Sequence, residues 1–169
     1  MPAGQAHTAG MFKTICLGLA LCLVGCAGQP PQPGASRDEV LRSWGAPTSR
    51  YALPEGAERL EYASGPYGRQ TWMIDTDRGG RVLQSQQVLG EAEFQRVLSI
   101  PGLRRDELLR QIGRPGERRH GGWQGGEVWS WRYPTNDCLW FQVSLAGDGT
   151  VTGGGYFVDP VCDARPDIH

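Results

Sequence analysis

The fold of this chain depends on a stretch that occurs twice. It is Arg37-Asp38-Glu39-Val40-Leu41-Arg42-Ser43-Trp44-Gly45-Ala46-Pro47, and it returns 68 residues later as Arg105-Asp106-Glu107-Leu108-Leu109-Arg110-Gln111-Ile112-Gly113-Arg114-Pro115. Seven of the eleven positions are identical, and the apolar positions stay apolar at the spacing of one buried helix face. Each copy ends in Gly and then Pro, which favour the end of a helix and forbid its continuation. The pattern therefore predicts two equivalent short helices.

The similarity continues beyond the helix at an offset of 68 or 69. The matched residues are Gly56, Glu58, Leu60 and Tyr62 with Gly125, Glu127, Trp129 and Trp131, then Trp72 with Trp140, and Gly80 and Val82 with Gly149 and Val151. Alternation and turn residues predict strands in both copies. The expected strands are residues 60–63, 71–76 and 81–88, and later 139–145 and 151–158, with a further short strand at 49–53. These matches favour two copies of one unit over a single irregular domain.

The two copies differ at their beginning. Residues 91–98 carry Phe94, Val97 and Leu98 on one helical face, so a helix of its own precedes the second copy. The first copy follows a Pro-rich segment that cannot be helical. We therefore expect an α+β protein of two tandem, two-layer units, each a helix or a helix pair against a three-stranded antiparallel sheet.

Five segments follow from this division. Residues 1–25 are a signal peptide with its true start at Met11, 26–35 a spacer, 36–90 the first repeat, 91–163 the second repeat and 164–169 a tail. The spacer contains Pro30, Pro31 and Pro33 and is expected to be extended, which would set the folded part off a membrane.

The N-terminal segment predicts a membrane anchor. Lys13 precedes an apolar run over residues 14–24 that is too short for a permanent transmembrane helix. The run closes in Leu23-Val24-Gly25-Cys26, which resembles the bacterial lipoprotein signal. The resemblance implies cleavage before Cys26 and its acylation, and Ala27 in the next position implies sorting to the outer membrane. A plain signal peptide that happens to contain cysteines is the alternative.

Two cysteines remain after Cys26. Cys138 and Cys162 flank the predicted 139–145/151–158 hairpin, and an oxidising compartment favours their pairing in a disulfide across its open end. The alternative is a redox-active thiol pair, but the spacing is not CxxC.

The composition argues against several functions. The net charge of −1 provides no electrostatic attraction to nucleic acid. The histidines beyond the signal, His120 and His169, lie far apart, so no zinc site or Ser/His/Asp set can be assembled. Asp75 and Asp77 are expected to be structural, and the Gly-rich residues 121–126 precede a strand instead of opening a helix. We expect no catalytic residue, no metal, no cofactor and no enzymatic activity.

The aromatic residues of the second copy leave two interpretations open. Trp129, Trp131 and Tyr133 share one strand face by alternation, which is typical of a core built with Leu108, Leu109 and Ile112. Alternatively, Trp123 in the Gly-rich loop, together with Trp129 and Trp131, forms a patch that docks a partner.

The second copy resembles the SmpA/OmlA (BamE-like) lipoprotein domain. The matching residues are Pro101-Gly102-Leu103-Arg104-Arg105-Asp106-Glu107-Leu108-Leu109, Gly113-Arg114-Pro115 and Trp129-Ser130-Trp131-Arg132-Tyr133. The resemblance implies a lipid-anchored, periplasm-facing outer-membrane protein whose partners are envelope proteins such as the β-barrel assembly machinery. Tandem units and the Cys138/Cys162 pair depart from the family pattern.

The tandem arrangement also resembles the β-lactamase inhibitor protein. That likeness implies the alternative role of a periplasmic inhibitor or binding module for an envelope enzyme. A weaker third hypothesis is an enzyme such as a cell-wall hydrolase, which a deep cleft with converging polar groups would favour.

Overall fold

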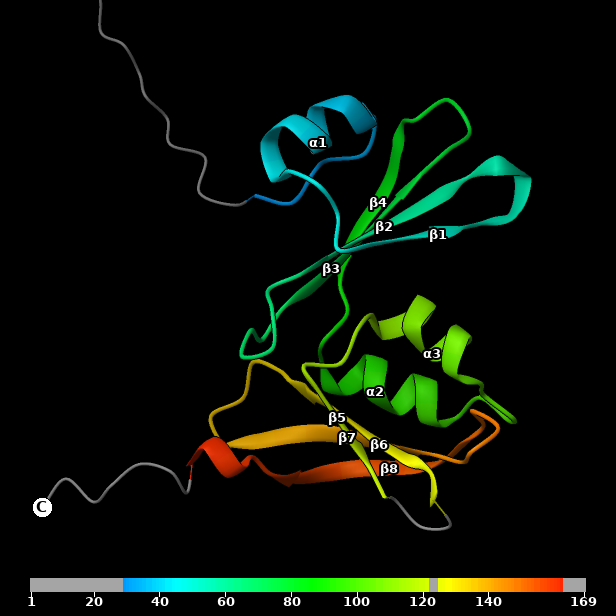
Figure 1. Cartoon of the computed structure of the whole chain (residues 1–169). Helices are drawn as coiled ribbons and strands as arrows, with labels where there is room; N and C mark the ends of the chain where they lie inside the picture. Colours follow the sequence, from blue (N-terminus) through cyan, green and yellow to red (C-terminus); the bar gives the residue numbers. More distant parts are fainter. Residues whose placement is uncertain (1–28, 122–124, 163–169) are drawn as a thin grey trace, which may run out of the picture.

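The structure is a computed structural model that describes residues 29–121 and 125–162. Its helices and strands follow each other as α1, β1 to β4, α2, α3 and β5 to β8 (Figure 1). Their bounds are α1 Arg37–Trp44, β1 Ser49–Ala52, β2 Glu58–Ala63, β3 Thr71–Thr76, β4 Val82–Gln87, α2 Glu91–Leu98, α3 Arg105–Ile112, β5 Glu117–His120, β6 Glu127–Arg132, β7 Leu139–Leu145 and β8 Val151–Val158. Two 3₁₀ turns, Pro54–Gly56 and Pro160–Cys162, complete the described elements.

The strands form two four-stranded antiparallel sheets, in the orders β1-β2-β3-β4 and β5-β6-β7-β8. The α+β class and the tandem sheets are confirmed, but the expectation of three strands per unit is wrong. The additional edge strands are β1, which coincides with the short strand expected at residues 49–53, and β5. Strand β5 has the sequence Glu-Arg-Arg-His and is mostly exposed, so no apolar alternation marks it.

Backbone details show that the two units repeat each other. The bridge between Ser36 and Arg81 returns between Arg104 and Thr150. The bulge after Asp75 in β3 returns after Ser144 in β7. The offset is therefore 68 through the helix and the first strand of each sheet, and 69 in the other strands.

This change of offset makes the predicted match of Trp72 with Trp140 wrong. Trp72 pairs with Gln87 as Phe141 pairs with Tyr156, so Trp72 is the equivalent of Phe141 and not of Trp140. The second unit has one extra residue between β5 and β6, which shifts the match by one position, and one position moves a side chain to the other face of a strand.

The predicted helix ends are confirmed. Ser36 caps α1, since its Oγ accepts a hydrogen bond from the Glu39 N–H at 3.2 Å. Gly45 and Gly113 follow α1 and α3 with φ of 78° and 75°, which only glycine adopts readily. Each helix is also tied to its own sheet, because Tyr62 Oη and its equivalent Trp131 Nε1 donate to the carbonyls of Gly45 and Gly113 at 3.0 and 3.1 Å.

The elements stack in four layers: α1, the first sheet, the α2/α3 pair and the second sheet (Figure 1). Val40 of α1 packs on Leu60, Ile74 and Val82 of the first sheet. The larger core lies between α2/α3 and the second sheet, and Met73 on the opposite face of the first sheet joins it. The expectation of two-layer units is thus incomplete, because the helices of the second unit contact both sheets.

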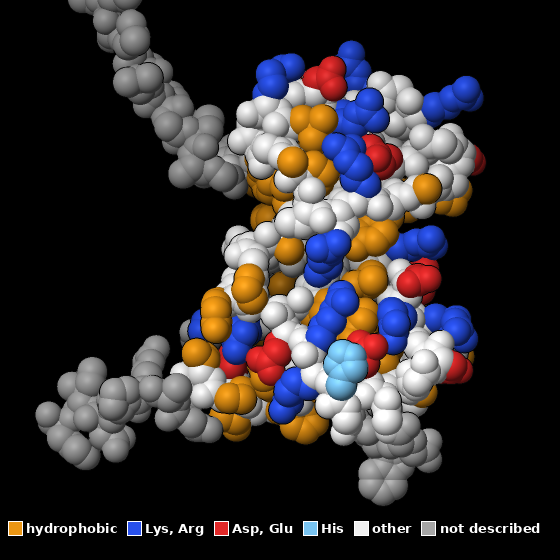
Figure 2. Space-filling model, in the orientation of Figure 1, with side chains coloured by type: hydrophobic (Ala, Val, Ile, Leu, Met, Phe, Trp, Pro, Cys, Tyr) orange, Lys and Arg blue, Asp and Glu red, His pale blue; other side chains and the backbone are white. Residues whose placement is uncertain are grey.

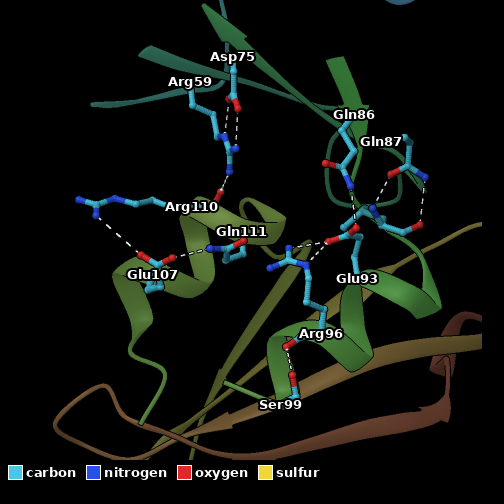
Figure 3. A network of polar contacts seen from close by, with 11 residues as sticks. Arg59, Asp75, Gln86, Gln87, Glu93, Arg96, Ser99, Glu107, Arg110 and Gln111 are labelled. Atoms are coloured by element: carbon cyan, nitrogen blue, oxygen red, sulfur yellow. Dashed lines mark hydrogen bonds and ion pairs between the residues drawn. The ribbon is translucent and has the colours of Figure 1, made fainter. Parts of the chain in front are cut away.

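The contact between the first sheet and α2/α3 is largely polar (Figure 3). Arg59 donates to both carboxylate oxygens of Asp75, at 2.6 and 2.8 Å, and to the carbonyl of Arg110 in α3 at 2.7 Å. Gln86 of β4 donates to Glu93 of α2 at 2.7 Å. These bonds satisfy polar groups that the stacking of the layers removes from water.

The Arg59–Asp75 pair should make stability depend on pH. Burial disfavours the charge on Asp75, but hydrogen bonds from Arg59 and Gln84 outweigh burial and hold the pKa of Asp75 below its usual value. Because the pKa of Asp75 is lower in the folded state, its charged form stabilises the protein at pH values above the unfolded-state pKa of about 4. This stabilisation is lost as the pH falls from there through the folded-state pKa.

We therefore expect Asp75→Asn to lower the free energy of unfolding at pH 7. At pH 3 the free energies of unfolding of the variant and the wild type should differ less than at pH 7. Urea unfolding at the two pH values measures both quantities. An Asp77→Asn control tests a carboxylate at the hairpin turn, which accepts the Arg81 N–H instead of an arginine side chain. Equal pH dependence of the wild type and Asp75→Asn would contradict the argument.

The segment before α1 is bound to the body of the protein. Gly34 N–H donates to the carbonyl of Val82 at 2.8 Å, and Val82 N–H donates back to Ala35 at 2.9 Å. Ser85 Oγ donates to the carbonyl of Pro31 at 2.6 Å. Residues 29–35 are non-helical, as expected, but they run along β4 and are not a free spacer.

Candidate functional site

A groove with a volume of about 690 Å³ lies on the first unit. It lies between α1, the segment 29–35 and the near ends of β2 and β3. Its apolar lining consists of Pro31, Ala35, Val40, Trp44, Tyr62, Ala63 and Trp72. Its polar lining is mainly Gln29, Gln32, Glu39, Ser43, Ser64 and Gln70. We call this feature the α1 groove.

The aromatic side chains of the α1 groove hold each other in place. Trp44 meets Tyr62 edge-on with ring centroids 5.3 Å apart, and it meets Trp72 in the same way at 6.0 Å. Burial raises the pKa of Tyr62, so its hydroxyl keeps the proton that it donates to Gly45. These three aromatic side chains therefore form one wall of the groove.

In the second unit, α2 covers the surface that is equivalent to the α1 groove. There Phe94 of α2 stacks on Phe141, with centroids 4.1 Å apart and planes at 6°, and meets Tyr133 edge-on at 5.3 Å. The equivalents of Phe141 and Tyr133 in the first unit are Trp72 and Ser64, and both line the α1 groove. The groove thus occupies the position that α2 fills in the second unit.

Figure 2 shows how apolar side chains gather on the first unit. Orange side chains lie in the upper part of the molecule beside the point where the grey N-terminal segment joins it. Arginine side chains are scattered over the rest of this face, and the single pale blue histidine belongs to the lower part. Other apolar side chains are visible on the lower part of the molecule, and the most exposed large ones, Tyr67, Val158, Phe157 and Leu83, do not line the α1 groove.

The structure separates the predicted partner-binding tryptophans. Trp129 and Trp131 are each 1% exposed and belong to the core with Leu108 and Ile112, which confirms the core interpretation. As buried side chains they offer no surface to a partner, because α2 and α3 cover this face of the sheet. Trp123 lies outside the described residues, and so does Cys26.

Cys138 and Cys162 form a disulfide, with Cα atoms 6.4 Å apart. The bond links the start of β7 to the turn after β8, as the hairpin predicted. A sequence separation of 24 gives a loop-closure contribution of about 3 kcal/mol.

A small polar cavity of about 190 Å³ lies between the first sheet and α2/α3. Arg59 and Arg96 reach into it, but they pair with Asp75 and Glu93. Figure 3 shows these polar groups directed at one another. In the described part of the chain, no three His, Cys, Asp or Glu side chains gather in a way that could hold a metal ion.

Trp44 and Trp72 line the α1 groove but are not among the site residues predicted from the sequence. The signal was present, because the first copy was expected to lack the leading helix. Apolar side chains that face that helix in the second copy must remain uncovered in the first. Among residues 29–121 and 125–162, no helix is long and apolar enough to cross a membrane.

Three solved structures are weakly similar to this chain. No family model and no curated protein matches the chain. Among solved structures it is similar to a DUF4309 family protein from Bacillus subtilis, at 10% identity and a TM-score of 0.30 over 74% of this chain and 79% of that chain. It is also similar to a cysteine-rich secretory protein from Staphylococcus aureus, at 10% identity and a TM-score of 0.29 over 78% of this chain and 48% of the other. An extracellular protein with an SCP domain from Bacillus anthracis has 11% identity and a TM-score of 0.29 over 80% of this chain and 50% of the other. The chain spans about half the length of these last two proteins.

Proposed function

We propose that this chain is an outer-membrane lipoprotein, anchored through Cys26 and facing the periplasm, that acts by binding other envelope proteins and not by catalysis. Its role is in the assembly of outer-membrane β-barrels or in envelope integrity, as the resemblance to BamE-like domains implies. The observation that carries the proposal is the α1 groove, which leaves uncovered the apolar surface that the second copy of the same unit buries under a helix.

Two further observations support a binding role. The groove volume of about 690 Å³ lies within the usual range of binding cavities, roughly 300 to 1,000 Å³. Aromatic residues, which dominate the energetics of protein interfaces, form its wall. The segment that precedes the groove begins three residues after Cys26, so an acyl anchor there would hold the groove near the membrane surface.

The test is site-specific photocrosslinking in cells that produce the full-length protein. A photoreactive phenylalanine analogue replaces Ser43, which lines the α1 groove, or Arg42, the neighbouring exposed residue of α1 that does not. We expect crosslinks to barrel-assembly subunits from position 43 and markedly fewer from position 42. Cys26→Ser should release the protein from the membrane fraction.

Other outcomes would change the proposal. Crosslinks to a single soluble periplasmic enzyme would replace barrel assembly with the inhibitor role. Absence of any specific crosslink at position 43, with the protein present in the outer membrane, would contradict a binding role for the groove. A Cys26→Ser protein that stays in the membrane fraction would contradict the anchor.

A further inference from the structure

The α1 groove has a template for its occupant within the same chain. In the second unit the equivalent surface holds α2, whose Phe94 and Val97 are both 0% exposed and whose Gln95 and Arg96 face solvent. An amphipathic helix with one aromatic residue on its apolar face is therefore known to fit this arrangement of helix and sheet.

The described residues of the first unit contain no counterpart of this helix. At the offset of 68, the counterpart of α2 would cover residues 23–30, followed by the segment that leads into α1. The described part of that region, residues 29–34, is non-helical and contains Pro30, Pro31 and Pro33. Proline removes a helical hydrogen bond and clashes with the preceding turn. A helix from another molecule can complete the first unit at this place.

The lining sets the chemistry of that helix. Trp72 replaces Phe141 as the stacking surface, and Ser64 stands where the second unit has the larger Tyr133, so the groove has room for a large aromatic side chain. Glu39 is the charged residue among the lining side chains and is exposed at the edge of the groove. A basic residue beside the aromatic one would therefore be favoured.

We infer that the α1 groove binds an amphipathic helix of a partner envelope protein, which presents an aromatic residue to Trp72 and a basic residue to Glu39 and so takes the place that α2 holds in the second unit. This is helix-in-groove recognition, in which residues at helical spacing anchor one apolar face. The inference deepens the proposed function and rests on it for the source of the helix.

The probe is a synthetic peptide with the sequence of residues 88–101, which includes α2. Because helices of this length are marginal in water, a side-chain bridge joins positions 91 and 95, both exposed in the protein. The receptor is the chain from residue 26 to residue 169 with Cys26→Ser. Binding is followed through the indole N–H resonances of Trp44 and Trp72 in nitrogen-15-labelled protein.

We expect the peptide to shift these two resonances, and its Phe94→Ala form to bind at least about tenfold more weakly, which corresponds to about 1.4 kcal/mol. The protein variant Ser43→Trp fills the groove and should weaken binding by at least the same factor. Arg42→Trp adds the same side chain one position away, outside the lining, and should bind the peptide as the wild type does.

Two results would overturn the inference. One is the absence of shifts at millimolar peptide while the Arg42→Trp and wild-type spectra show a folded protein. The other is a shift of both indoles by monomeric dodecylphosphocholine but not by the peptide, which would assign the groove to an acyl chain. If crosslinks from position 43 are found together with either result, the proposed function remains and only the inference of a helical partner is rejected.

Discussion

Replacing Phe94 by alanine should lower the free energy of unfolding by about 3 to 5 kcal/mol, the usual range for a fully buried phenylalanine. The ring is 0% exposed, stacks on Phe141 and contacts Tyr133 and Tyr156. Its removal opens a cavity between α2 and the second sheet. Since domains are stable by only about 5 to 15 kcal/mol, this single change should remove a large fraction of the total.

Urea unfolding, monitored by far-ultraviolet circular dichroism and by tryptophan fluorescence, measures this effect. The control is Leu83→Ala, because Leu83 is 53% exposed and should change the stability by no more than about 0.5 kcal/mol. A loss below about 1 kcal/mol for Phe94→Ala would mean that α2 does not cover the second sheet as described.

Glu61→Ala should cost at least about 3 kcal/mol, because removing this buried acceptor leaves three hydrogen-bond donors without a partner, at about 1 to 3 kcal/mol each. Glu61 is 0% exposed in β2, between the first sheet and the end of α3. Its carboxylate accepts hydrogen bonds from Tyr51 Oη at 2.6 Å, from the Arg114 N–H at 3.1 Å and from Thr48 Oγ1 at 3.2 Å. Burial and the adjacent Glu61 raise the pKa of Tyr51, so its hydroxyl remains a donor.

The matched control is Glu58→Ala in the same strand. Glu58 pairs with Arg37 and Arg50 at the surface, where such pairs contribute about 0 to 1 kcal/mol. Thermal unfolding separates the two variants, and Tyr51→Phe combined with Glu61→Ala gives the coupling energy of that hydrogen bond. Equal losses for the Glu58 and Glu61 variants would contradict the placement of Glu61 at the junction of the two units.

Much of the local structure could be predicted from the sequence. The repeated Gly-x-Pro ends, the Ser36 cap and the apolar spacing of α1 and α3 are local signals, and α2, β3, β7 and β8 lie at their predicted bounds. Strand β5 could not be predicted, because Arg118 and Arg119 lie in an exposed edge strand with no apolar pattern. Edge strands depend on backbone pairing with a neighbour, which the local sequence does not record.

The stacking of the first sheet on α2/α3 could not be predicted from the sequence for a different reason. The face of the first sheet that meets α2/α3 carries Arg59, Glu61 and Asp75, and charged residues on a strand normally indicate a solvated face. Hydrogen bonds make their burial tolerable, because Arg59 pairs with Asp75 and Glu61 accepts from Tyr51, Thr48 and Arg114. These partners lie on other elements of the chain. The α1 groove, by contrast, followed from a feature visible in the sequence, the missing first helix.

Residues 29–35 are bound along β4, and this limits the distance between the folded part of the protein and a bilayer that holds an acylated Cys26. An acyl group on Cys26 would leave only Ala27 and Gly28 between the anchor and Gln29, which already lines the groove. At no more than about 3.6 Å per residue, the reach from Cys26 to Gln29 is about 11 Å. A groove tied so closely would lie near the lipid headgroups, and the second sheet would be the layer farthest from α1 and the anchor.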